Sequence, residues 1–325
     1  MGAKAIHNYR KSYGSWMDKG KWPNFYLIIL LTFFAFAGAN DTLVKTVEIT
    51  LPEKEPVELR PYATINFPAI NEASGLVKSQ LWKDVFWIHN DSGDEPRIFP
   101  INDDGSIIKP SWMKDYAGIR IPDAVNVDWE SIATDDRGNL YIGDIGNNSS
   151  TRRDLCIYVV EEPYPFQTVT TCVSKRIPFY YSDQKIIPPK KENFDAEAMF
   201  WRDGKLYILT KHRSDRYTKL YRLDSMSSFE KNSATLIGQF NIQGQVSGAD
   251  ISPDGMKLVV LTYNAVWMFE VDKKSDDFFK GRISWLPIKA GYVEAICLDG
   301  KKIIIASEEG KLYKLYEDDL MKLKE

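Results

Sequence analysis

The sequence predicts an all-β protein, a five-bladed β-propeller of four-stranded antiparallel blades. The prediction depends on a repeated phrase: a short strand that starts with polar residues, a Gly-containing turn, and an apolar strand. The phrase occupies residues 128–144 and recurs at 195–210, 246–262 and 293–307, with a looser copy at 71–89. A β-propeller builds one blade from each repeat of this kind, and the copies lie about 45 to 70 residues apart.

Two further strands are predicted after each of the three middle copies of the phrase. They occupy residues 155–160 and 173–181, then 219–223 and 234–240, then 266–271 and 282–286. These runs are rich in the β-branched and aromatic residues that strands favour. Four strands in each of five units give five blades. The alternative, a six-bladed ring, would need a hidden blade, and the sequence has no spare strands for one.

Residues 1–39 are predicted to be a secretory signal peptide. The apolar run Phe25–Ala37 follows Lys19 and Lys21 and ends in small residues that fit a small-x-small cleavage site. The run is short for a bilayer, which needs about 20 apolar residues, and an uncleaved anchor is the alternative. Both Met1 and Met17 are candidate starts. We expect a secreted or periplasmic protein that meets a membrane only through this segment, if the segment is not cleaved.

The predicted propeller domain covers residues 67–318. Residues 40–66 are a Pro- and Glu-rich lead-in whose strand-like stretch Leu43–Thr50 is predicted to complete the last blade, because Lys311–Tyr316 leaves that blade one strand short. Ring closure of this kind protects strand edges from aggregation. Residues 319–325 are a charged tail, expected to be a short helix or a frayed end. We expect a monomer.

The charge balance excludes one class of partner. The formal net charge is −3, with no run of like charge, whereas a nucleic-acid partner would require a basic face. We therefore expect no nucleic-acid binding.

The cysteines predict one disulfide. Cys156 and Cys172 lie on either side of residue 164, and a hairpin centred there would place them opposite each other, within disulfide reach. Export to an oxidising compartment favours the bridge. Two reduced thiols are the alternative. Cys297 is interpreted as a core residue.

The first strand of each propeller blade borders the central channel, so equivalent residues converge there from all sides. The equivalent positions are Glu72, Glu130, Glu197, Ser247 and Glu294. Four crowded carboxylates cannot all stay ionised without a cation. Oxygen ligands with no matching His or Cys suit Ca²⁺ better than Zn²⁺, and the surplus charge is expected to be neutralised by a residue such as Lys211. A wet channel lined by these side chains is the alternative.

A second group of polar residues is predicted at the channel mouth, where inner strands begin or end. It comprises Asn90, Asp91, Asp128, Asp144, Asp195, Lys211, Thr262 and Glu308. A small-molecule or glycan ligand entering the channel would meet these side chains. Asp91, Asp144 and Lys211 are the candidate catalytic residues, because each could assist a metal ion in activating water or substrate.

Several phrases carry a family resemblance: Asn71-Glu-Ala-Ser-Gly-Leu, Asn90-Asp-Ser-Gly, Asp128-Trp-Glu-Ser-Ile-Ala, Leu140-Tyr-Ile-Gly-Asp-Ile-Gly-Asn-Asn148, Val246-Ser-Gly-Ala and Val293-Glu-Ala-Ile. Over residues 68–316 the chain resembles secreted bacterial propellers similar to the SdiA-regulated and phytase-like esterase propellers. The order of the axial residues is similar to the ring that holds one Ca²⁺ in the five-bladed soluble calcium-activated nucleotidases (apyrases). The resemblance implies a metal-dependent hydrolase of phosphate or other esters.

Three functions therefore stay open. The first is a Ca²⁺-dependent hydrolase. The second is a ligand-binding or scaffold propeller with a structural Ca²⁺. The third is a carbohydrate-binding propeller whose Trp and Tyr rings stack on sugars, although strand aromatics such as Trp87, Tyr141, Tyr207 and Trp267 more commonly pack between blades.

Overall fold

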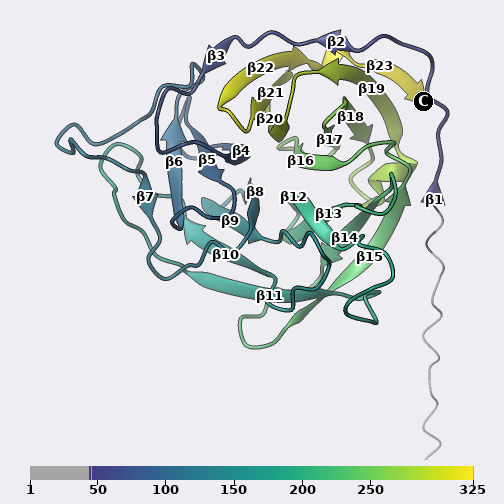
Figure 1. The fold of residues 1–325 in the computed structure, drawn as a ribbon, viewed down its shortest axis with the longest axis horizontal. Coiled ribbons are helices and arrows are strands. Elements are labelled where there is room, and N and C mark those ends of the chain that lie inside the picture. The colour runs from purple at the N-terminus through teal and green to yellow at the C-terminus, as the bar shows by residue number, and fades with distance from the viewer. Residues whose placement is uncertain (1–43, 45, 325) are drawn as a thin grey trace, which may run out of the picture. The chain divides into compact units, whose positions relative to one another are not determined.

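The computed structural model describes residues 44 and 46–324, and these form a ring of antiparallel sheets around a central axis (Figure 1). The chain is a five-bladed β-propeller, as predicted. Blade 1 contains β4 (Ala73–Lys78), β5 (Phe86–Asn90), β6 (Arg97–Ile101) and β7 (Ile119–Arg120). Blade 2 contains β8 (Trp129–Thr134), β9 (Asn139–Asp144), β10 (Cys156–Glu161) and β11 (Lys175–Tyr181). Blade 3 contains β12 (Asp195–Arg202), β13 (Lys205–Lys211), β14 (Thr218–Leu223) and β15 (Asn232–Phe240).

The remaining blades complete the ring. Blade 4 contains β16 (Val246–Ile251), β17 (Lys257–Thr262), β18 (Ala265–Glu270) and β19 (Arg282–Lys289), with the short 3₁₀ helix η1 (Phe278–Lys280) before its last strand. Blade 5 contains β20 (Val293–Asp299), β21 (Lys302–Ser307) and β22 (Lys311–Tyr316). Its fourth strand is β3 (Ala63–Thr64), which pairs antiparallel with β22.

The lead-in follows the outer rim of three blades before it closes the ring (Figure 1). Strand β1 (Thr46–Val47) pairs in parallel with β15, and β2 (Val57–Glu58) pairs in parallel with β19. The strand expected within Leu43–Thr50 therefore covers the edge of blade 3 and does not complete the last blade. The closing strand is β3. The chain needs the residues between β1 and β3 to reach from blade 3 to blade 5, so a strand near residue 46 is too early to close the ring.

The charged tail forms a strand rather than a helix or a frayed end. After the 3₁₀ helix η2 (Glu317–Asp319), β23 (Met321–Lys324) pairs antiparallel with β19. Met321 and Leu323 pack against the core between blades 3 and 4. Alternation of these apolar residues with lysines has the period of a strand with one buried face.

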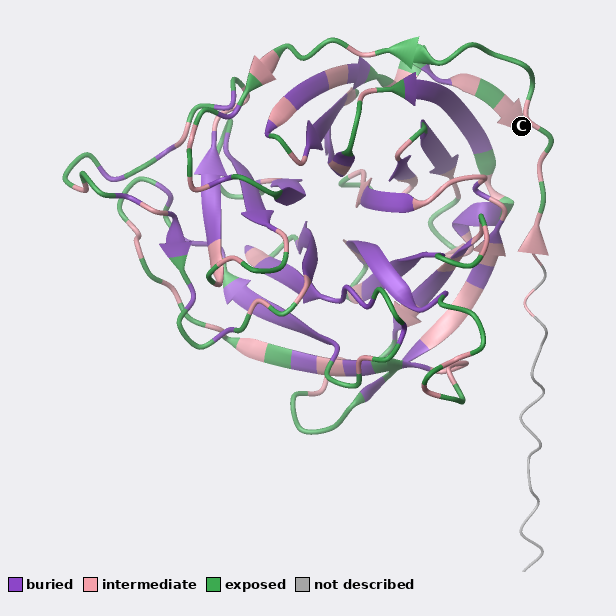
Figure 2. Cartoon of the chain, in the orientation of Figure 1, coloured by how far each residue is buried: buried purple, intermediate pink, exposed green. Residues whose placement is uncertain are grey.

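The core lies between neighbouring blades, and the strands are buried while the connecting loops are exposed (Figure 2). Trp87, Trp129 and Trp267 are among the largest fully buried side chains. Tyr141 and Tyr207 are buried as well. These five aromatic side chains therefore pack in the interior, as the more common interpretation of strand aromatics predicts.

The expected disulfide is absent, because the hairpin that carries it has a different centre. Cys156 lies opposite Pro178 in the β10–β11 ladder, and β11 begins only at Lys175. Cys172 is exposed in the preceding loop, and both thiols are free. Cys297 is buried in β20, in the core between blades 5 and 1.

The predicted signal peptide, residues 1–39, lies outside the described residues. Within the described part of the chain, no helix has the length and apolar character needed to cross a bilayer.

Candidate metal site and channel mouth

Each inner strand has a one-residue bulge at the same position near its start. In blade 2, Trp129 pairs with Asp144 and Ser131 pairs with Gly143, which leaves Glu130 without a partner. The same shift leaves out Glu197, Ser247 and Glu294 in blades 3, 4 and 5. Bulges redirect a side chain and occur next to active sites. The repeated bulge brings these residues to equivalent positions around the channel.

In blade 1 the bulge residue is Ser74, and the assignment of Glu72 to this ring was wrong. The register shifts between Ala73 and Gly75, whereas Glu72 precedes β4 and is exposed. The hydroxyl of Ser74 donates to Glu130 Oε2 at 3.3 Å. A small residue follows the bulge in every blade, so aligning Ser74-Gly75 with Ser247-Gly248 would have identified the correct position.

Gly75 is required by the close approach of the imidazole of His89. A Cβ atom at position 75 would lie 2.2 Å from His89 Nε2. His89 is fully buried, and its ring packs edge-on against Trp129 at 5.7 Å between centroids. No methyl group fits there unless this packing between blades 1 and 2 changes.

We expect Gly75→Ala to lower the free energy of unfolding by about 1–3 kcal/mol, the usual cost of overpacking a core. Urea denaturation followed by tryptophan fluorescence measures the change. Gly143→Ala is the matched control in the neighbouring blade, since its methyl group would meet only the flexible end of Ile145 at 3.1 Å. Equal stability of the two variants would contradict the tight contact.

A buried network of hydrogen bonds joins the axial residues of blades 3, 4 and 5. Lys211 Nζ lies 2.9 Å from Glu197 Oε1 and donates to the hydroxyl of Tyr263 at 2.8 Å. That hydroxyl donates to Glu294 Oε1, also at 2.8 Å. Ser247 donates to the carbonyl of Val293 at 2.7 Å. The ammonium group therefore neutralises this side of the ring, as expected for Lys211.

Burial raises the pKa of both Glu130 and Glu197. The pKa of Glu197 rises to about 7, although Lys211 opposes the shift. The pKa of Glu130 also rises well above its ordinary value, and the neighbouring charge of Glu197 adds to the effect of burial.

Three carboxylates converge at the mouth on the side of blades 1 and 2. One oxygen from each of Asp91, Asp128 and Glu130 lies within 4.8 Å of the others. Asp91 follows β5, Asp128 precedes β8, and Glu130 is the bulge residue. Gly146 lies against the group, since a Cβ there would be 2.4 Å from Asp128 Oδ2 and 2.6 Å from Glu130 Oε1.

A second layer of polar residues fixes this acidic group. The carboxylate of Asp144 accepts the backbone N–H of Asp128 at 3.0 Å and binds Arg152 at 2.9 Å. Arg152 also donates to the carbonyl of Gly146 at 2.8 Å. Asp144 is almost fully buried. It therefore supports the acidic group and does not line the mouth.

The crowding at the mouth is visible in the ionisation of Asp128. Burial raises its pKa to about 6, and the charge of Asp91 contributes in the same direction. Burial also raises the pKa of Asp144, against the effect of Arg152. Among the described residues, Asp91, Asp128 and Glu130 form no ion pair, because Arg152 binds Asp144 and Lys211 binds Glu197.

Other residues predicted at the mouth hold the loops in place. The amide of Asn90 donates to the Ala69 carbonyl and to Asp94, both at 2.7 Å. Asp195 is fully buried and binds Arg213 at 2.7 Å. Thr262 is fully buried and donates within its own turn, to Asn264 and the Ala265 carbonyl. Glu308 is half-buried, and its carbonyl accepts the N–H of Ala73 at 3.1 Å.

No family model and no curated protein matches this sequence. Solved structures match it at low identity. A chain from a crystal structure of a nidogen–laminin complex is 14% identical with a TM-score of 0.39, and the match covers 75% of this chain and 84% of that chain. A chain from a crystal structure of a mitotic checkpoint complex is 13% identical with a TM-score of 0.39, covering 85% of this chain and 99% of that chain. The five-bladed assignment rests on the strand pairing described above.

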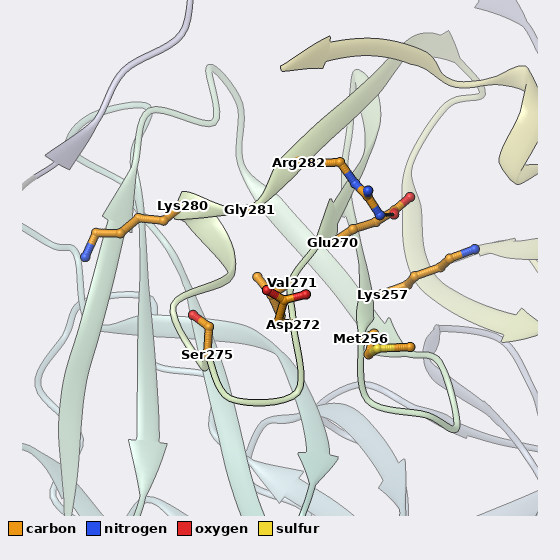
Figure 3. A pocket seen from close by; sticks show the side chains of 9 residues that line it. All are labelled: Met256, Lys257, Glu270, Val271, Asp272, Ser275, Lys280, Gly281 and Arg282. Atoms are coloured by element: carbon orange, nitrogen blue, oxygen red, sulfur yellow. Dashed lines mark hydrogen bonds and ion pairs between the residues drawn. The ribbon is translucent and has the colours of Figure 1, made fainter. Parts of the chain in front are cut away.

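A cavity of about 450 Å³ lies in blade 4, where β17 begins, β18 ends and β19 begins (Figure 3). Its charged side chains are paired with other described residues, except for that of Asp272. Arg282 binds Glu270 at 2.5 Å, Lys257 binds Glu317 at 2.5 Å, and Lys280 binds Asp277 at 2.6 Å. None of the predicted mouth residues lines it. The acidic group at the mouth therefore remains the candidate site.

Proposed function

We propose that this exported propeller binds Ca²⁺ at the acidic group of Asp91, Asp128 and Glu130 and hydrolyses phosphate or other esters there. One observation carries the proposal: three carboxylates converge in a partly desolvated place, and no side-chain cation from residues 46–324 is paired to them. Clustered carboxylates in such a place either take up protons or hold a metal ion.

The residues present fit a hard divalent cation. All three side chains offer oxygen ligands, which Ca²⁺ prefers, and water or substrate oxygens would complete its six to eight ligands. The absent side chain at Gly146 leaves the carboxylates room to converge. The axial ring fits an ion less well, because Lys211 already binds Glu197 and reaches Glu294 through Tyr263.

The chemistry proposed for the mouth divides between the ion and the chain. When bound, Ca²⁺ would supply a Lewis acid for an ester oxygen. Asp91, Asp128 and Glu130 would hold it in their deprotonated forms. The Lys211 ammonium provides positive charge on the side of blades 3 to 5.

The resemblance to esterase propellers supports a hydrolase. With Ser74 in place of Glu72, the axial order becomes Ser, Glu, Glu, Ser, Glu. The calcium-activated nucleotidases hold their ion with the axial residues, whereas here Lys211 pairs with the axial Glu197, so that resemblance does not extend to the proposed site. We also propose that residues 1–39 direct export of the protein. The ligand at the mouth is proposed to be a small molecule.

We expect EDTA to lower the melting temperature of the purified protein and added Ca²⁺ to restore it. Ca²⁺ at 100 times its dissociation constant would add about 2.7 kcal/mol to the free energy of unfolding. Scanning calorimetry measures this change, and a screen of nucleotides, sugar phosphates and lactones with and without EDTA measures hydrolysis. Mg²⁺ at the same concentration is the control for general ionic effects.

The outcomes of these two measurements separate the functions. Turnover that depends on Ca²⁺ supports the hydrolase. Stabilisation by Ca²⁺ with no turnover of any ester would indicate a binding or scaffold propeller with a structural ion. An unchanged melting temperature in EDTA, together with no metal by elemental analysis, would refute the proposed site.

A further inference from the structure

We propose that a cavity between blades 3 and 4, beside the channel mouth, binds a second anionic group of the ligand whose first anionic group meets the metal. The cavity measures about 510 Å³. The loop after β13, the linker between β15 and β16, and the turn after β17 form its walls. Its lining residues are Arg213, Ser214, Asp215, Arg216, Gln243, Gly244, Gln245, Tyr263 and Asn264. Only the binding of the first anionic group, at the metal, depends on the proposed function.

Tyr263 connects this cavity to the channel. It lines the cavity, and its hydroxyl bonds to Lys211 and Glu294 of the axial network. Lys211 binds Glu197 at 2.9 Å, and the charge of Glu197 acts on Glu130 of the acidic group. Tyr263, Lys211 and Glu197 therefore lie between the cavity and the candidate metal site.

One cationic side chain of the cavity is available to an anion. Arg216 is exposed and has no ion pair within the described part of the chain. Arg213 also lines the cavity, but it binds Asp195 at 2.7 Å. The one acid of the lining, Asp215, pairs with Lys191 at 3.3 Å and bonds to the His212 ring at 2.6 Å and to the amide of Asn193 at 2.7 Å. Arginine is well suited to bind phosphate or carboxylate through paired N–H groups.

The neutral part of the lining consists of hydrogen-bonding groups held in a constrained backbone. Gln243 has a φ of 54°, in the left-handed region that non-glycine residues rarely adopt. Its side chain donates to the carbonyl of Ile49 in the lead-in at 3.2 Å, and its N–H donates to the carbonyl of Arg216 at 3.0 Å. Such outliers cluster at ligand sites. Here the outlier places the Gln243 backbone against the loop that carries Arg216.

These features define the chemical class of the ligand. An ester with one anionic group would bind at the metal and leave the cavity empty. A ligand with a second phosphate or carboxylate would bind both places, and hydroxyl groups between them would meet the amides of Gln245 and Asn264 and the hydroxyl of Ser214. We therefore infer a hydroxyl-bearing ligand with two anionic groups, of the sugar bisphosphate kind.

The test compares Arg216→Gln with the wild-type full chain by calorimetry, using glucose 1,6-bisphosphate and glucose 6-phosphate as probes, each with and without Ca²⁺. Loss of charge-assisted hydrogen bonds should weaken bisphosphate binding about tenfold or more. Binding of the monophosphate should change less than about threefold, since its one anionic group prefers the metal. Arg60→Gln is the matched control, because Arg60 is exposed on the lead-in, outside the cavity lining.

The result distinguishes this inference from the proposed function. If Arg216→Gln weakens bisphosphate binding but Ca²⁺ has no effect on either probe, the result supports anion binding in the cavity and refutes the proposed metal site. If Ca²⁺ strengthens binding of both probes but Arg216→Gln binds the bisphosphate as the wild type does, the cavity is refuted and the metal site stands. Equal losses in Arg216→Gln and Arg60→Gln would also refute the cavity.

Discussion

Replacing Lys211 with methionine should lower the free energy of unfolding by about 3–5 kcal/mol in alkaline solution, where Glu197 is ionised, the usual cost of leaving a buried charge without its partner. The side chains of Lys211 and Glu197 are 6% and 4% exposed, and their charged atoms lie 2.9 Å apart. Methionine retains much of the length of lysine, so the loss is electrostatic rather than a cavity. Glu197 would be left with only the longer contact to Arg213 at 3.5 Å.

The stability that Lys211→Met loses relative to the wild type should increase as the pH rises. The folded-state pKa of Glu197 is about 7, above its ordinary value of 4.5, so the native state holds this proton more tightly than the unfolded chain. Stability from this group is complete below pH 4.5 and is lost as the pH rises through about 7. Without Lys211 the pKa of Glu197 rises further. The variant should therefore approach wild-type stability in acid and fall furthest behind it above neutral pH.

Urea denaturation at several pH values measures this prediction. Lys205→Met on the same strand is the matched control, since Lys205 pairs with Asp224 at the surface and its loss should cost less than about 1 kcal/mol. Adding Glu197→Gln to Lys211→Met should recover much of the lost stability. A deficit that stays constant with pH, or one that Glu197→Gln does not relieve, would show that the pair contributes through packing alone.

The repeat and its inner ring were predictable because they follow from local patterns. Alternating apolar strands with a Gly-containing turn specify a hairpin, and five copies specify the ring. Glu130, Glu197, Ser247 and Glu294 were identified because each begins the same phrase. Glu72 was misassigned because the bulge, rather than residue type, fixes which side chain occupies the position, and a shift in strand register is weakly encoded in one sequence.

Features that depend on pairing between distant segments were less predictable. The hairpin centre that separates Cys156 from Cys172 is set by the β10–β11 register, and the closing role of Ala63–Thr64 depends on how far the lead-in travels round the rim. The acidic group joins Asp91 from one blade to Asp128 and Glu130 from the next. All three acids were named from the sequence. Only the assembled ring shows that they lie together, and that Lys211 binds Glu197 instead of this group.

Asp128→Asn should weaken Ca²⁺ binding about 100-fold, since the affinity of an oxygen site follows its number of charged ligands. Glu294→Gln should leave the affinity within about threefold, because Glu294 accepts a hydrogen bond from Tyr263 and lies outside the acidic group. Calorimetric titration of Ca²⁺ into each variant measures both. If the whole axial ring held the ion, Glu294→Gln would weaken Ca²⁺ binding as much as Asp128→Asn does. That result would indicate an axial metal site and contradict the acidic group.

The same titration has a pH dependence that identifies Asp128 as the ligand. Its pKa of about 6 means that a proton competes with Ca²⁺ as the pH falls, so the affinity of the wild type should decrease below pH 6. Binding at that pH should release protons, which titrations in two buffers of different ionisation enthalpy would detect. Asp128→Asn cannot release this proton, and its residual affinity should vary less over the same range. A wild-type affinity that is constant from pH 7 to below 6 would mean that Asp128 does not contact the ion, because metal ligands must be deprotonated to bind.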